Sequence, residues 1–131
     1  MTKKILFVCI ENSNRSQMAQ AFAKIYGKEK IAAYSAGSKP SGMVNPKAIQ
    51  AMADMGYDLS VHESKSLKEV EALAPFDVVI TMGCGDACPW MPAKQFIDWQ
   101  ITDPRNLDKE KFNLVRDEIA LKVKTLIDEI I

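Results

Sequence analysis

The sequence lacks an excess of charge of either sign. Its 131 residues carry 17 Lys and Arg against 17 Asp and Glu, so the formal net charge at pH 7 is zero. Proteins that coat nucleic acid or an anionic membrane surface need a basic excess. The balance therefore argues against broad electrostatic capture of either polyanion, and we expect neither nucleic acid nor membrane as a partner.

Cysteine and histidine are scarce, with three Cys and one His in the chain. An odd and small number of cysteines excludes a disulfide scaffold and favours a reducing compartment, so we expect a cytoplasmic protein with free thiols. A structural zinc site needs about four ligands. All four of these residues would have to converge on one ion, and we therefore expect no metal and no other cofactor. His62 lies in a polar stretch and is expected to be solvated.

Long apolar runs are also missing. The run from Ile5 to Ile10 has only six residues and includes Cys9, whereas a membrane span needs about twenty apolar residues and a secretory signal needs a longer core with a cleavage site. A hydrophobic fraction of 47% with 26% charged residues describes an ordinary globular chain of one-domain size. We expect a single domain over residues 1–131.

Apolar periodicity predicts an α/β fold. Continuous apolar runs of the kind found in buried strands and three- to four-residue helical spacings alternate along the chain. This alternation predicts a three-layer domain with a four-stranded parallel sheet and helices on both faces. The expected strands are 5–8, 31–34, 78–80 and one within 96–101, and the expected helices are 15–27, 46–56, a short one within 64–72, and 107–131.

The second of these helices is expected to begin at an Asn45 cap with Pro46 at its first position. Its apolar side is predicted to carry Ala48, Ile49, Met52 and Met55.

The loop after the first strand is a candidate anion site. It contains Cys9 and Arg15 with five residues between them, and it leads directly into a helix. In sheets of this type ligands bind at the carboxyl ends of the strands. Backbone N–H groups of a tight loop and the positive end of the following helix can hold a tetrahedral anion and favour a Cys9 thiolate. The candidate oxyanion-binding residues are Ile10, Glu11, Asn12, Ser13, Asn14, Arg15 and Ser16.

Arg15 is expected to supply a planar fork for two oxygens of the anion. Ser16 can donate a hydrogen bond to the thiolate, and Asn12 can brace the loop. The competing interpretation makes Cys9 a small buried residue at a strand end and Arg15 a surface residue.

A second cysteine pair follows the third strand. Cys84 and Cys88 are four residues apart, which on a helical turn places their Cα atoms about 6 Å from each other, within disulfide range. Gly83 and Gly85 give the segment conformational freedom, and Pro89 limits helix continuation. The pair can therefore cycle between dithiol and disulfide. Two buried structural thiols are the alternative.

Asp103-Pro104 follows the predicted fourth strand. An Asp at this place in the fold can lean over the anion loop and protonate a leaving oxygen. Asp-Pro is also a common turn, and without further context that interpretation is the preferred one. Arg105, which comes next, can add attraction for an anion, but we expect it to be solvated.

The strand-Cys-x-x-Asn-Ser-x-Arg-Ser-x-Met-Ala pattern resembles the phosphate-binding loop of low-molecular-weight protein tyrosine phosphatases and of the arsenate reductases that share their fold. Segments 34–37, 44–49, 77–82 and 115–119 resemble arsenate reductase segments, so the resemblance covers most of the chain. Glu11 departs from the pattern, because the family usually has Gly there. A carboxylate in an anion loop would repel the substrate, so we expect it to point outward.

The resemblance implies reduction of arsenate to arsenite. Cys9 would attack arsenic while Asp103 protonates the departing oxygen, and Cys84 would then attack the Cys9 sulfur and release arsenite. Cys88 would move the disulfide to Cys84–Cys88, and thioredoxin or another thiol reductant would reduce it. The absence of aromatic residues after Asp103-Pro104, where the phosphatases carry them, points to a small inorganic oxyanion.

Two other functions remain open from the sequence. One is a phosphatase that hydrolyses phosphate monoesters through the same Cys9 and Asp103. The other is a non-catalytic redox-sensing or oxyanion-binding protein, in which Glu11 has weakened the anion loop.

Overall fold

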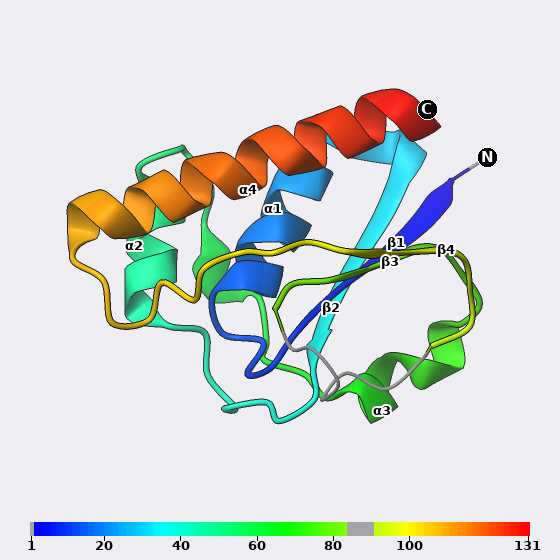
Figure 1. Ribbon diagram of the computed structural model, residues 1–131, viewed down its shortest axis with the longest axis horizontal. Helices are drawn as coiled ribbons and strands as arrows, with labels where there is room; N and C mark the ends of the chain where they lie inside the picture. Colours follow the sequence, from blue (N-terminus) through cyan, green and yellow to red (C-terminus); the bar gives the residue numbers. More distant parts are fainter. Residues whose placement is uncertain (1, 84–90) are drawn as a thin grey trace.

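The computed structural model describes residues 2–83 and 91–131. Four parallel strands form one sheet in the order β2-β1-β3-β4, with helices on both faces (Figure 1). The predicted three-layer α/β fold is confirmed. The strands are β1 (Lys3–Cys9), β2 (Ile31–Gly37), β3 (Phe76–Thr81) and β4 (Ala93–Asp98), and the α-helices are α1 (Arg15–Gly27), α2 (Pro46–Ala53), α3 (Leu67–Val70) and α4 (Lys109–Ile130). Short 3₁₀ helices span Lys28–Lys30, Leu59–Val61 and Glu71–Leu73.

Strand β1 lies at the centre of the sheet and is buried on both sides. Successive side chains of a strand point to opposite faces, so Ile5, Phe7 and Cys9 pack into the core beneath α1, α2 and α4. Leu6 and Val8 pack into the smaller core on the opposite face, beside α3. Cys9 therefore ends a central strand on the side that faces α1.

Helix α4 is the long amphipathic helix that the spacing predicts. It begins at Lys109, after an Asp108 cap whose side chain accepts a hydrogen bond from the Lys111 amide. Apolar residues at three- and four-residue spacing form its buried face: Phe112, Val115, Ile119, Val123, Leu126 and Ile127. The predicted cap of α2 is likewise confirmed, because Asn45 Oδ1 accepts from the Lys47 amide at 2.9 Å.

Several predicted boundaries are wrong, and the largest errors, of three residues, are in β2, α2 and β4. Strand β2 runs to Gly37, beyond the predicted end at residue 34. Helix α2 ends at Ala53, three residues before Gly56, so that Met55 is 46% exposed instead of packing with the helix face. Strand β4 covers Ala93–Asp98 and not 96–101. It is an edge strand with a mostly exposed polar surface, so apolar periodicity does not mark its register.

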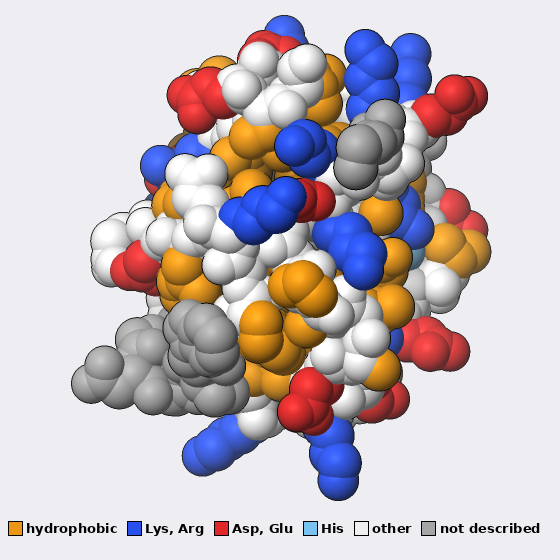
Figure 2. All heavy atoms as spheres, turned by 90° about the vertical axis from the view of Figure 1, so that its right-hand side faces the viewer, with side chains coloured by type: hydrophobic (Ala, Val, Ile, Leu, Met, Phe, Trp, Pro, Cys, Tyr) orange, Lys and Arg blue, Asp and Glu red, His pale blue; other side chains and the backbone are white. Residues whose placement is uncertain are grey.

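The surface seen from the right-hand side of Figure 1 mixes the two signs of charge. Figure 2 shows Lys and Arg side chains interspersed with Asp and Glu and with hydrophobic side chains on this face. In the part of the chain that the structure describes, none of the helices is long and apolar enough to cross a lipid bilayer.

Candidate active site

The loop that joins β1 to α1 turns its carbonyl groups outward. The carbonyls of Cys9, Ile10 and Glu11 accept hydrogen bonds from the amides of Ser38, Lys39 and Ser41, at 2.8 to 3.2 Å. Within residues 2–83 and 91–131, the amides of residues 11–14 donate none of the hydrogen bonds that tie the loop to its neighbours. Helix α1 also starts without a side-chain cap. The loop and the helix end therefore offer unpaired N–H groups, as an anion site requires.

Cys9 lies at the base of this loop, and its Sγ is 2.9 Å from Ser16 Oγ. Asn12 is fully buried and fixes the direction of that hydrogen bond. Its Oδ1 accepts from the backbone amide of Lys65 at 2.7 Å, so its Nδ2 points to Ser16 Oγ, also at 2.7 Å. Because Ser16 accepts from Asn12, its own hydroxyl proton is available to the Cys9 sulfur. Asn12 has a φ of 51°, a left-handed conformation that Asn tolerates.

Arg15 is almost completely buried beside Cys9, and its Nη1 donates to the carbonyl of Ile101 at 3.3 Å. Gly83 makes room for the guanidinium: a Cβ at Gly83 would overlap Arg15 Nη1, and the φ of Gly83 is 94°. The sequence analysis interpreted Gly83 only as freedom for the cysteine pair and missed this close approach. Gly83 and Arg15 are 68 residues apart in the sequence, so no local sequence pattern could have predicted their contact.

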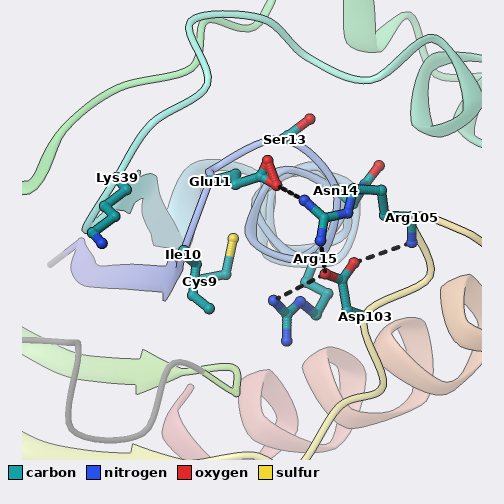
Figure 3. A pocket seen from close by; sticks show the side chains of 9 residues that line it. All are labelled: Cys9, Ile10, Glu11, Ser13, Asn14, Arg15, Lys39, Asp103 and Arg105. Carbon is teal, nitrogen blue, oxygen red and sulfur yellow. Dashed lines mark hydrogen bonds and ion pairs between the residues drawn. The ribbon is translucent and has the colours of Figure 1, made fainter.

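Asp103 reaches the same pocket from the segment after β4. Its Oδ2 is 3.9 Å from Arg15 Nη2, and its Oδ1 accepts from the backbone amide of Arg105 at 3.0 Å. Figure 3 shows the carboxylate between the guanidinium groups of Arg15 and Arg105. The pocket has a volume of about 360 Å³ and is lined by Cys9, Ile10, Glu11, Ser13, Asn14, Arg15, Lys39, Asp103 and Arg105.

Arg105 is exposed, as predicted, but its guanidinium is also paired with carboxylates, which the sequence analysis did not anticipate. Its Nη1 donates to Glu11 Oε1, and its Nη2 lies 3.9 Å from Asp103 Oδ2. The Glu11 carboxylate at the pocket edge is therefore neutralised by a guanidinium. Sequence reasoning considered Glu11 and Arg105 separately, because they are 94 residues apart.

His62 is half-buried, and the prediction that it is solvated was wrong. Its Nε2 is 2.6 Å from the Tyr57 hydroxyl, and its Nδ1 is 3.0 Å from Gln17 Oε1. Burial, together with the positive charges of Lys24 and Lys65, lowers the pKa of His62 from 6.5 to about 4. The ring is therefore neutral at pH 7. Gln17 in turn donates to Asn12 Oδ1 at 2.9 Å, so His62 supports the loop from behind.

The second predicted cysteine pair, Cys84 and Cys88, lies outside the described residues. Among the residues that are described, no cluster of three or more His, Cys, Asp or Glu side chains is arranged to hold a metal ion. The site that the structure brings together thus consists of Cys9, the loop amides, Arg15 and Asp103, with Ser16 and Asn12 behind the sulfur.

Comparison with known proteins gives consistent matches over almost the whole chain. The glutaredoxin arsenate reductase of Synechocystis sp. is 42% identical over 131 residues, which cover 98% of each chain. Arsenate reductase 1 of Staphylococcus epidermidis is 41% identical and covers 94% of each chain. A solved structure of an arsenate reductase in the phosphate binding state has a TM-score of 0.90 at 41% identity, covering 99% of this chain and 100% of the other.

A family model provides the broader assignment. The model of the low molecular weight phosphotyrosine protein phosphatase matches residues 4–131. Because this match covers nearly the whole chain and relatives at 41–42% identity support it, the protein belongs to the low molecular weight phosphotyrosine protein phosphatase family.

Proposed function

We propose that this protein is an arsenate reductase that reduces arsenate to arsenite with Cys9 as its nucleophile. The observation that carries the proposal is the placement of the Cys9 sulfur at the base of a loop with unpaired amides and beside buried Arg15. Curated relatives over 40% identical are named arsenate reductases. The described sheet carries both the anion loop and the Asp103 segment, and we treat residues 1–131 as one functional domain.

The first step forms a covalent adduct. Unpaired N–H groups of the loop and the Arg15 fork bind three oxygens of arsenate, and the Cys9 thiolate attacks arsenic. Asp103 donates one proton to the departing hydroxyl group of hydrogen arsenate, which leaves as water. A Cys9–arsenic bond replaces an arsenic–oxygen bond, and arsenic is still As(V).

The reduction follows from the other two cysteines, as the family resemblance implies. The Cys84 thiolate attacks the Cys9 sulfur, the electron pair of the sulfur–arsenic bond passes to arsenic, and arsenite leaves as As(III). The Cys88 thiolate then attacks the Cys84 sulfur of the Cys9–Cys84 disulfide. This exchange forms the Cys84–Cys88 disulfide and releases the Cys9 thiolate. An external dithiol supplies the two electrons that restore the pair. The chemistry needs no metal or organic cofactor.

The reductant belongs to the thiol class, and the names of relatives suggest two candidates. One relative is named a glutaredoxin arsenate reductase. The Corynebacterium glutamicum thioredoxin-dependent arsenate reductase has a TM-score of 0.82 at 30% identity over 98% of this chain and 61% of that one. Because the cycle needs reduced thiols, we place the protein in the cytoplasm.

Phosphate-monoester hydrolysis is the second candidate function. Phosphate and arsenate share shape and charge, and the family match is to a phosphotyrosine phosphatase. In that case water would resolve a phospho-Cys9 intermediate, and Cys84 and Cys88 would be dispensable.

An arsenite-release assay tests the proposal, with thioredoxin, glutaredoxin and small thiols supplied separately. We expect arsenite from the wild type with at least one thiol system, and a loss of at least about a thousandfold in the Cys9→Ser variant. The Cys88→Ser variant should accumulate a Cys9–Cys84 disulfide, which mass measurement of proteolytic fragments identifies.

Three results would contradict the proposal. Continued arsenite release by Cys9→Ser would remove Cys9 as the nucleophile. Unchanged turnover in Cys84→Ser together with strong phosphate-ester hydrolysis would favour the phosphatase. If no thiol system gives arsenite and no ester is hydrolysed, the protein is a binding or redox-sensing protein.

A further inference from the structure

An ion pair between Arg105 and Glu11 crosses the pocket mouth, and together with the Arg15–Asp103 pair it joins the anion loop to the segment that carries Asp103. Arg105 Nη1 donates to Glu11 Oε1, and Figure 3 shows the Arg105 side chain reaching from its own loop to the anion loop. Both side chains are partly exposed, 54% for Arg105 and 33% for Glu11. Exposed ion pairs contribute little to stability, so this contact is better explained by its effect on the pocket than by its effect on folding.

Arg105 also holds Asp103 by two contacts. Its backbone amide donates to Asp103 Oδ1 at 3.0 Å, and its Nη2 lies 3.9 Å from Asp103 Oδ2. Arg15 is the other cation near that carboxylate, at 3.9 Å. Because a bound oxyanion engages the Arg15 fork, Arg105 is the cation that remains to orient Asp103 when substrate is present.

The backbone of the same segment is fixed from α2. Lys47 Nζ donates to the carbonyls of Arg105 and Leu107 at 3.2 and 3.3 Å. The Arg105 backbone is therefore held from one side by Lys47 and its side chain from the other by Glu11. Because both the backbone and the side chain of Arg105 are held in place, its contacts can fix the orientation of the Asp103 carboxylate.

Glu11 creates a charge problem that Arg105 solves. The charged side chains lining the pocket are Arg15, Lys39 and Arg105 against Glu11 and Asp103. If Arg105 lost its charge, the carboxylate of Glu11 would stand unpaired at the edge of a site for a dianion. Like charges repel, so an unpaired carboxylate at the pocket edge would weaken anion binding.

We propose that Arg105, anchored by Glu11, is a positioning residue that orients Asp103 over the Cys9 site and cancels the repulsion of Glu11 toward the incoming oxyanion. The inference rests on the proposed function for its catalytic half, because Asp103 is the general acid there. Its binding half requires only that the pocket takes a tetrahedral anion.

The phosphate Kd and kcat of three variants test the binding and the catalytic parts of this inference separately. Titration calorimetry gives the Kd of inorganic phosphate, and saturating arsenate gives kcat. Arg105→Gln should weaken phosphate binding about fivefold and lower kcat about tenfold, a fraction of what a general acid contributes. The double variant Glu11→Gln/Arg105→Gln should return the phosphate Kd to within about twofold of wild type while kcat stays low. Glu11→Gln alone should bind phosphate at least as tightly as the wild type and lose kcat about threefold.

The matched control is Lys94→Gln. Lys94 is 79% exposed and pairs with Asp77 at 3.4 Å, away from the pocket-lining residues. It should leave both the phosphate Kd and kcat unchanged. A double variant that recovers kcat along with the Kd would overturn the positioning role, and an Arg105→Gln variant equal to the wild type in both readouts would overturn the whole inference.

A failure of the proposed function gives a different result. If the wild type releases no arsenite, kcat is measured on phenyl phosphate, whose poor leaving group also depends on protonation of the departing oxygen. A wild type inactive on both substrates removes the catalytic half, and the phosphate Kd values then decide the neutralisation of Glu11 by themselves.

Discussion

At the scale of single residues, the pocket depends on the absence of a side chain at Gly83. Gly83 has no side chain, and the guanidinium of Arg15 fills the space that a Cβ would take. Arg15 is buried and keeps one nitrogen on the Ile101 carbonyl, so it has little freedom to move aside. The fork is thus held ready for an anion before one arrives, which lowers the cost of binding.

We expect Gly83→Ala to raise the phosphate Kd at least about tenfold, since the new methyl group displaces the Arg15 fork. Titration calorimetry measures this. Gly56→Ala is the control, because Gly56 has a φ of 81° and nothing lies within 4 Å of its added Cβ. Gly56→Ala imposes a similar conformational strain on the backbone and should bind phosphate with wild-type affinity. Equal loss of affinity in both variants would show that backbone strain alone is responsible.

His62 links stability to pH. Its pKa is about 4 in the folded protein and near 6.5 in the unfolded chain, so below pH 6.5 the unfolded chain binds the extra proton. The free energy of unfolding should therefore fall as pH drops from about 6.5 to about 4, and this contribution is fully present only above 6.5. For a half-buried ring we expect a loss on the order of 1–2 kcal/mol.

Urea unfolding at several pH values between 4 and 7.5 measures this loss, with His62→Asn as the comparison. The stability advantage of the wild type over the variant should shrink as pH falls through this window. A constant difference across the window would mean that His62 does not carry the effect.

At the scale of elements, β2 is fitted to the anion loop. A Cβ at Gly37 would lie 2.5 Å from the Ile10 carbonyl oxygen and 2.9 Å from the Asn12 amide nitrogen. The end of β2 therefore supports the curved backbone of the loop directly, without side chains between them. The packing of the end of β2 therefore determines the position of the loop amides.

Gly37→Ala should distort this contact, destabilise the protein by about 1–3 kcal/mol and weaken phosphate binding. Gly27→Ala serves as the control, because its Cβ would overlap the Ile31 side chain at the far end of α1. It should lose stability but keep phosphate affinity in the folded fraction. Chemical denaturation and phosphate titration together distinguish the two variants.

Elements with a strong local pattern could be predicted from sequence, and elements defined by distant contacts could not. The buried face of α4 and the loop from Cys9 to Ser16 are local features. None of the residues of edge strand β4 is fully buried, so its bounds were misplaced. The burial of His62 and the pairing of Glu11 with Arg105 arise only when segments 45 and 94 residues apart meet.

At the scale of the whole molecule, the position of β1 explains why one loop dominates the site. Strand β1 lies between β2 and β3, and all four strands are parallel, so their carboxyl ends share one edge. The loop after β1 is flanked there by the ends of β2 and β3, while Asp103 arrives from beyond β4. A chain with zero net charge can thus concentrate a local anion site at one edge of its sheet.

The outward-turned carbonyls of the anion loop have a consequence for hydrogen exchange. In the free protein the amides of residues 11–14 have water as their acceptor, so they should exchange quickly although they sit against a buried core. Phosphate at about 100 times its Kd should slow them about 100-fold, and the amides of the β1–β2 ladder should change little by comparison. Unchanged exchange on phosphate addition would contradict anion binding by these amides. Four backbone protons then report, residue by residue, when the site is filled.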